Sequence, residues 1–97
     1  MLCHFSHTYG HGTSMYLILL GEEDNAENAE KQILKLWDVA MNVCLRTGAS
    51  LAHHHGIGIA RQPYMKKALG ANQLVIDKLK QVFDPNNIMN PGKMASV

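Results

Sequence analysis

The stretch SMYLILLGEEDNAENAEKQILKLWDVAMNVCLRTG, residues 14–48, holds both kinds of regular structure that this chain can form. It begins with an almost continuous apolar run, which is typical of a β-strand covered on both faces. The polar segment 21–30 then leads into a helix, with Asp24 or Asn25 as its N-cap. Apolar side chains recur there at steps of three and four, and Gly48 is a stop signal. The residues on this face are Ile33, Leu34, Trp37, Ala40, Met41 and Cys44.

The remaining segments extend this pattern to an α+β chain. We expect strands at about 2–9 and 13–20, interrupted at 10–12 by a glycine-rich bulge, turn or ligand contact. Downstream, the sequence predicts a short strand or extended segment at about 49–55. A short helix from Pro63 to Leu69 and a second helix at about 72–83 follow, and then an irregular tail. The expected fold has two to three strands, about three helices and turn chemistry at its C-terminal end.

Composition excludes several classes of function. The 97 residues include 9 Lys and Arg against 8 Asp and Glu, so charge gives no reason to expect a nucleic acid or an anionic membrane. The longest apolar run is far below the roughly 20 residues that span a bilayer. The N-terminus does not have the pattern of a signal peptide. The two cysteines do not make a disulfide framework, and we predict free thiols in a cytoplasmic protein.

A sheet this small would leave an edge or a face uncovered. The sequence therefore also suggests a fragment, or a module that associates with further copies of itself. We expect a homo-oligomer on this ground. A non-catalytic oligomerising α+β module remains one alternative.

Six histidines are the main chemical feature of the chain, and His53, His54 and His55 are consecutive. Along a strand, successive side chains point to opposite faces. His53 and His55 would then point one way and His54 the other, so one ion could not easily take all three. Pairing of His7 or His11 with the triplet in one sheet would allow a metal site, but we predict none.

Catalysis is the stronger interpretation of these histidines. Imidazole titrates near neutrality and can act as an acid, a base or a charge-stabilising donor. Tyr9 could be an acid/base partner, and Gly56 would let a flat ligand approach the backbone. Arg61 offers a planar cation suited to phosphate or carboxylate. The pattern predicts a polar wall for an anionic small molecule beside an aromatic cofactor.

Four segments in order and spacing carry a family resemblance over about residues 3–94: CHFSHTYGHGTSMYLIL, the amphipathic helix, LAHHHGIGIARQPYM and LKQVFDPNNIMNPGK. The chain resembles the C-terminal region of FAD-linked oxidases of the vanillyl-alcohol-oxidase type. Within them it most resembles the alkyldihydroxyacetonephosphate synthase branch of ether-lipid enzymes. The HHHG run is the most specific motif, since lactate and glycolate oxidases typically carry a GEHG-type sequence there.

The resemblance implies that residues 1–97 are a cap or substrate-domain fragment with a partial ferredoxin-like fold, lacking the FAD-binding domain. FAD would be held through that missing domain or subunit and not tightly by this chain, which would be inactive alone. The implied reaction exchanges an acyl group for a fatty alcohol without net redox change. The implied catalytic residues are Tyr9 and the triplet at 53–55. Beyond what the resemblance implies, we predict that Arg61 and His7 contact substrate and that His54, His55 and Gly56 contact the cofactor.

A second enzymatic alternative stays open. The same resemblance is compatible with a fragment of an FAD-linked oxidase or dehydrogenase that acts on a 2-hydroxy acid such as D-lactate or glycolate.

Overall fold

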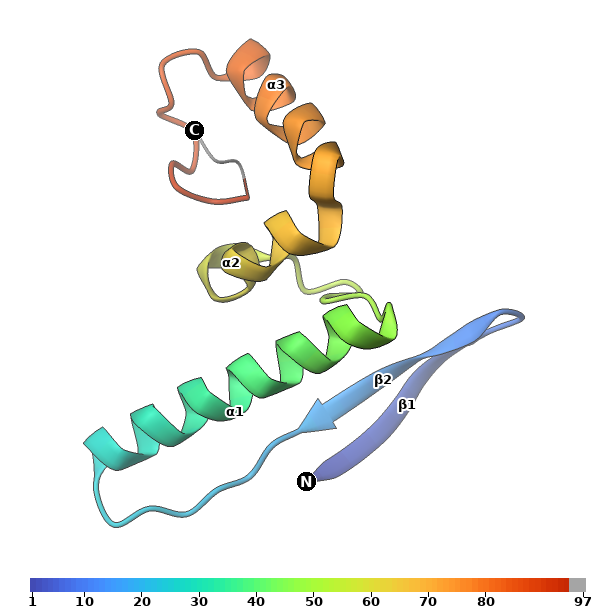
Figure 1. The fold of residues 1–97 in the computed structure, drawn as a ribbon, viewed down its shortest axis with the longest axis vertical. Coiled ribbons are helices and arrows are strands. Elements are labelled where there is room, and N and C mark those ends of the chain that lie inside the picture. The colour runs from blue at the N-terminus through green and yellow to red at the C-terminus, as the bar shows by residue number, and fades with distance from the viewer. Residues whose placement is uncertain (95–97) are drawn as a thin grey trace. The chain divides into compact units, whose positions relative to one another are not determined.

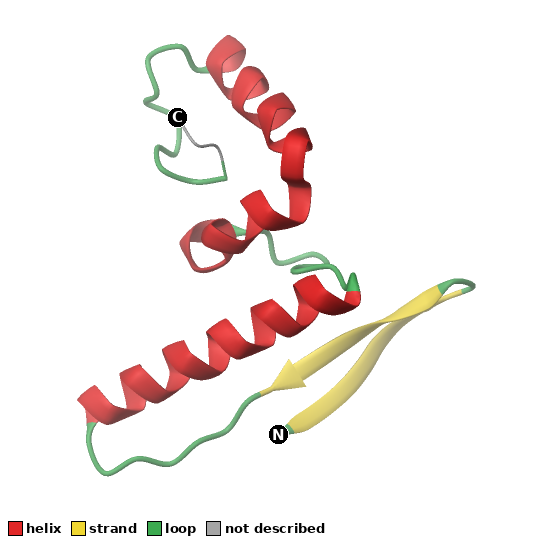
Figure 2. Cartoon of the chain, in the orientation of Figure 1, coloured by secondary structure: helices red, strands yellow, loops and turns green. Residues whose placement is uncertain are grey.

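The computed structural model describes residues 1–94, which divide into two compact units, residues 1–40 and the residues from 41 onward. Figures 1 and 2 show the elements in chain order. The expected α+β class is confirmed, with two strands, three α-helices and one short 3-10 helix in residues 1–94. The elements are β1 (Leu2–Tyr9), β2 (Gly12–Ile18), α1 (Ala26–Thr47), α2 (Gly58–Leu69), η1 (Gly70–Asn72) and α3 (Gln73–Phe83).

The first unit is built on an antiparallel hairpin of β1 and β2. Gly10 and His11 form its two-residue turn, so the interruption expected at 10–12 is a turn. A register shift lies between Phe5 and His7, which leaves Ser6 as the bulged residue. Beyond the bulge, the Thr13 hydroxyl donates a 2.7 Å hydrogen bond to the carbonyl of His7 and secures the end of the hairpin.

Helix α1 begins and ends close to the predicted positions. Asn25 is the cap, because its Oδ1 accepts the backbone N–H of Asn28 at 2.9 Å. An exposed ion pair between Lys31 and Glu27 at 2.5 Å follows one turn later. At the other end Gly48 has φ +71, and the next N–H, that of Ala49, bonds the Cys44 carbonyl at 3.0 Å. This left-handed residue closes the helix as the glycine signal predicts.

Helix α2 is longer than the sequence predicts. The sequence predicts that Pro63 opens the helix, but the helix begins at Gly58 and Pro63 lies in its interior. Because proline has no N–H, Pro63 cannot make the i→i−4 hydrogen bond that would otherwise run to the carbonyl of Ile59. Gly70 ends α2 with φ 54, as predicted, and the 3-10 turn η1 leads into α3 at Gln73.

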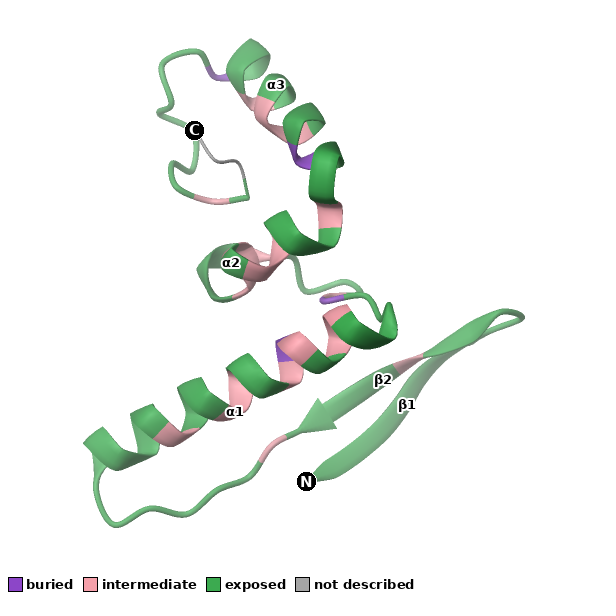
Figure 3. Cartoon of the chain, in the orientation of Figure 1, coloured by how far each residue is buried: buried purple, intermediate pink, exposed green. Residues whose placement is uncertain are grey.

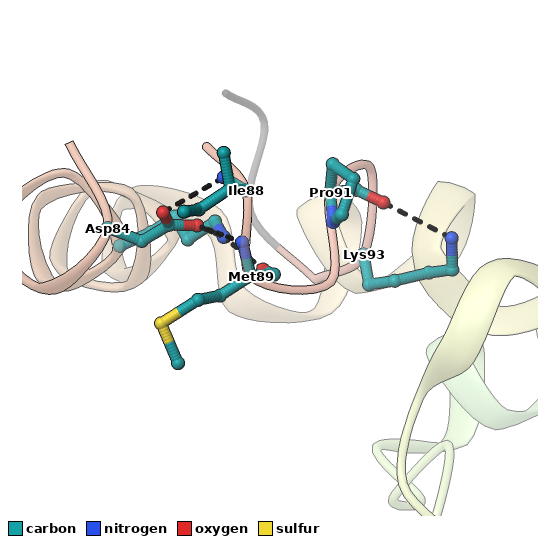
Figure 4. A network of polar contacts seen from close by, with 6 residues as sticks. Asp84, Ile88, Met89, Pro91 and Lys93 are labelled. Carbon is teal, nitrogen blue, oxygen red and sulfur yellow. Dashed lines mark hydrogen bonds and ion pairs between the residues drawn. The ribbon is translucent and has the colours of Figure 1, made fainter. Parts of the chain in front are cut away.

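The tail after α3 is folded around one carboxylate, Asp84, which is 7% exposed. Its Oδ1 accepts the N–H of Ile88 at 3.0 Å, and its Oδ2 accepts the N–H of Met89 at 2.9 Å (Figure 4). Lys80 donates both to Asp84 Oδ2 and to the carbonyl of Met89. The hydrogen bond from Lys80, helped by the two backbone N–H groups and opposed by burial, holds the pKa of Asp84 below its ordinary value of 3.8.

Gln73 makes a second tie to the tail from the start of α3. Its Nε2 donates to Asp77 Oδ1 and to the carbonyl of Met94, each at 3.0 Å. Both partners are acceptors, which fixes the orientation of the amide. The tail is therefore fastened to α3 near both of its described ends.

Few of the residues 1–94 are buried, as the colours in Figure 3 show. The buried residues are Met41, Leu51, Gln73 and Asp84. The apolar run of β2 is not covered as expected, since Met15 to Ile18 remain 37–55% exposed. A strand in a two-stranded hairpin has a solvated face unless another layer packs on it. Among the described helices, none combines the length and the hydrophobicity that crossing a bilayer would take.

Candidate functional site

The histidine triplet lies in the irregular loop between α1 and α2. Residues 49–55 contain no strand, so of the two predicted possibilities, a short strand or an extended segment, the strand is excluded. The loop is instead held by local contacts. Ser50 Oγ donates to the Ala52 carbonyl at 2.7 Å, and the side chain of Leu51 is buried with 7% exposure. The left-handed conformation of Gly56, φ +72, turns the chain toward α2.

Without a strand, the histidine side chains do not alternate between two faces. The Nδ1 atoms of His53 and His54 lie 2.9 Å apart, at hydrogen-bonding distance. Their rings meet edge to face with centroids 5.2 Å apart, and His54 meets His55 in the same way at 4.3 Å. The three imidazoles thus form one exposed cluster. Such a cluster offers several nitrogen donors and acceptors to a neighbouring ligand.

Arg61 joins α2 to both ends of this loop. Its Nε donates to the carbonyl of Leu51 at 3.0 Å, and its Nη1 donates to the carbonyl of Gly56 at 3.5 Å. The first bond is partly buried. The structure therefore brings Arg61 and Gly56 together with the triplet, as the sequence analysis groups them.

The other predicted site residues lie on the hairpin of the first unit. His7 and Tyr9 share one face of β1, with nearly parallel rings at 6.3 Å and 10°. His11 continues this row from the turn, 5.9 Å from Tyr9 at 18°. Ser6 Oγ lies 3.0 Å from His7 Nδ1. This ladder of aromatic rings is the arrangement expected for positions two apart on an extended chain.

His11 is the residue on this face to which sequence reasoning gave too little weight. The available signal was the spacing of two between His7, Tyr9 and His11. From sequence, the three residues share a face only if no bulge intervenes between them. The bulge lies earlier, at Ser6, so the face continues through the turn.

These groups are compatible with an acid/base wall, and comparison with known proteins identifies the family. Residues 1–94 match the family described as FAD linked oxidases, C-terminal domain. The chain belongs to this family, which confirms the resemblance and the expected link to FAD.

Three relatives show the range within the family. The chain is 41% identical over 93 residues to alkyldihydroxyacetonephosphate synthase of Trypanosoma brucei brucei, covering 95% of this chain and 15% of that protein. It is 37% identical over 92 residues to the uncharacterized FAD-linked oxidoreductase YgcU of Escherichia coli O157:H7, covering 92% and 19%. It is 31% identical over 90 residues to D-lactate dehydrogenase of Anaerostipes hadrus, covering 90% and 19%.

The chain thus spans less than a fifth of the length of these relatives. No solved structure matches it.

Proposed function

We propose that this chain supplies the histidine wall of an FAD-dependent enzyme of the alkyldihydroxyacetonephosphate synthase type, an ether-lipid activity. The observation that carries the proposal is the compact, exposed cluster of His53, His54 and His55. The identity to the trypanosomal synthase supports the choice of reaction.

The residues of the loop fit a flavin as neighbour. Imidazole nitrogens can donate to the ring edge, and a Cβ built on Gly56 meets nothing within 4 Å, so there is open space beside that backbone. His54, His55 and Gly56 would contact the cofactor, which supplies the electron-accepting ring. An FAD-binding domain or subunit is the partner that would hold the rest of it.

The residues of this chain would each take part in proton transfer or in substrate binding. The triplet at 53–55 would accept and return protons on the substrate, because imidazole does so near neutral pH. Tyr9 would act as an acid/base group from the hairpin, where the rings of His7 and His11 lie on either side of its own. His7 would contact the substrate, a small molecule with a phosphate or carboxylate. The sequence assigns Arg61 to that anion, although its guanidinium already donates to the carbonyls of Leu51 and Gly56.

The cellular setting and the oligomeric state are part of the same proposal. The cysteines Cys3 and Cys44 are free, which accords with a reducing, cytoplasmic setting. The exposed apolar face of β2 accords with a homo-oligomer or with cover by the FAD-binding partner.

The direct test measures exchange of a fatty acyl group for a fatty alcohol by the chain combined with an FAD-binding domain of the family. We expect His54→Ala and Tyr9→Phe each to lower kcat by about 100-fold or more, the usual contribution of a general acid or base. His4→Ala is the matched control, since His4 is an exposed histidine of β1 with no assigned role. Undiminished exchange in the double variant Tyr9→Phe, His54→Ala would contradict the assignment.

A second candidate is an oxidase or dehydrogenase for 2-hydroxy acids, favoured by the identity to D-lactate dehydrogenase. Here bound flavin would be bleached by D-lactate or glycolate in the absence of oxygen. Bleaching without acyl exchange would establish this alternative, and exchange without bleaching would exclude it.

A further inference from the structure

The guanidinium of Arg61 makes contacts that a substrate-binding cation does not need. Two of its N–H groups donate to backbone carbonyls, one of Leu51 and one of Gly56. Leu51 comes two residues before the triplet, and Gly56 comes directly after it. One side chain of α2 therefore ties down both ends of the segment that carries His53, His54 and His55.

The carbonyls of Leu51 and Gly56 differ in the other contacts that fix their positions. The Leu51 side chain is buried, so this end of the loop has an apolar anchor as well as the 3.0 Å bond from Arg61. Gly56 is exposed and has a left-handed backbone that glycine adopts at no steric cost. A glycine is also free to leave that conformation. The bond from Arg61 is thus a contact that restrains the glycine end of the triplet segment.

We propose that Arg61 is a positioning residue, which sets the arrangement of the three imidazoles by holding the carbonyls of Leu51 and Gly56. This role exists in the free protein and does not depend on a bound anion. The effect of this role on catalysis rests on the function proposed above. The effect on the arrangement of the histidine rings does not depend on that function.

The chemistry of the side chain explains why arginine suits this task. A guanidinium is planar and presents several donors in a fixed fork, so it can hold two carbonyls in a set geometry. A lysine has the same charge but a single ammonium on a flexible stem. Arg61→Lys therefore separates positioning from charge, because it keeps the cation and loses the two-point tie.

The first experiment observes the histidine rings of the free protein by NMR after selective labelling of histidine. We expect Arg61→Lys to shift and broaden the ring signals of His53, His54 and His55, while those of His4 on β1 stay unchanged. Arg46→Lys is the matched control, an exposed arginine in the last turn of α1. Unchanged triplet signals in Arg61→Lys would overturn the proposal. So would loss of the α3 amide signals, since that would reveal a role in general stability.

The second experiment separates positioning from anion binding. Inorganic phosphate is titrated into wild type and Arg61→Lys, and the acyl-exchange assay gives kcat and KM. Positioning predicts unchanged phosphate affinity, KM within about twofold and kcat lower by roughly 10- to 100-fold, as misplaced catalytic groups cause. A raised KM with weaker phosphate binding and unaltered histidine signals would make Arg61 a substrate ligand instead. If neither protein shows exchange, the proposed function fails, and the NMR result alone decides the positioning role.

Discussion

Leu51→Ala tests whether the histidine loop depends on a buried anchor. The Leu51 side chain is 7% exposed and belongs to the few that are buried in residues 1–94. Truncation of a buried leucine to alanine costs about 2–5 kcal/mol, depending on how far neighbours close the space. Because few side chains are buried around Leu51, its neighbours can close much of the space. We therefore expect the free energy of unfolding to fall by about 2 kcal/mol, the lower end of that range.

The assay is urea unfolding followed by far-ultraviolet circular dichroism. For a small domain, stability falls by about 1 kcal/mol per molar urea, so a loss of about 2 kcal/mol lowers the midpoint by roughly 2 M. Leu74→Ala is the control from the same unit, because Leu74 on α3 is 65% exposed. We expect its midpoint to move by less than about 0.5 M. Equal shifts in the two variants would refute the anchor role of Leu51.

Two further predictions concern the tail and the turn after the triplet. The lowered pKa of Asp84 means that its contacts stabilise the fold above the unfolded-state value and are lost as pH falls through the native value. The protection factors of the Ile88 and Met89 amides, which compare their exchange with the intrinsic rate at the same pH, should therefore fall only in acid. Asp84→Asn should remove this protection at neutral pH, and equal protection in the variant would contradict the prediction. Gly56→Ala should destabilise the protein by roughly 1 kcal/mol because φ is +72, whereas Gly10→Ala, at an equally open position without positive φ, should not. Thermal unfolding compares the two glycine variants, and an equal change in Tm would remove the argument from backbone strain.

The elements that could be predicted from sequence are those whose cause is local. The face of α1 from Ile33 to Cys44 recurs with the helical period, and its two ends have their own signals in Asn25 and Gly48. The bounds of β1 and α3 follow from the same kind of information. The start of α2 at Gly58 does not, because its N-cap residue, Ile57, makes no side-chain cap hydrogen bond and so leaves no capping signal in the sequence. A rule about proline alone places that start at Pro63.

The buried carboxylate of the tail shows a different limit of sequence reasoning. Asp84 followed by proline correctly marks the end of α3, and the segment after it has the composition of turns. That composition does not reveal that the Asp84 carboxylate gathers two backbone N–H groups and Lys80. Aspartate is rarely buried unless it is paired, so its burial is a consequence of these donors. The two backbone donors reach the Asp84 carboxylate only when residues 88 and 89 fold back towards the end of α3.

The histidine cluster at the candidate site was predictable from sequence in its residues but not in its geometry. Its residues were found from sequence because three consecutive imidazoles followed by glycine are chemically unusual. The arrangement of the three side chains could not be predicted in this way, since alternation along a strand would place His54 on the opposite face from His53 and His55. In the loop, the backbone is free of that alternation, and His53 and His54 bring their Nδ1 atoms within 2.9 Å. In place of a strand, the loop is ordered by local contacts that include the tie from Arg61, so the geometry of the triplet should respond to α2 and not to sheet pairing.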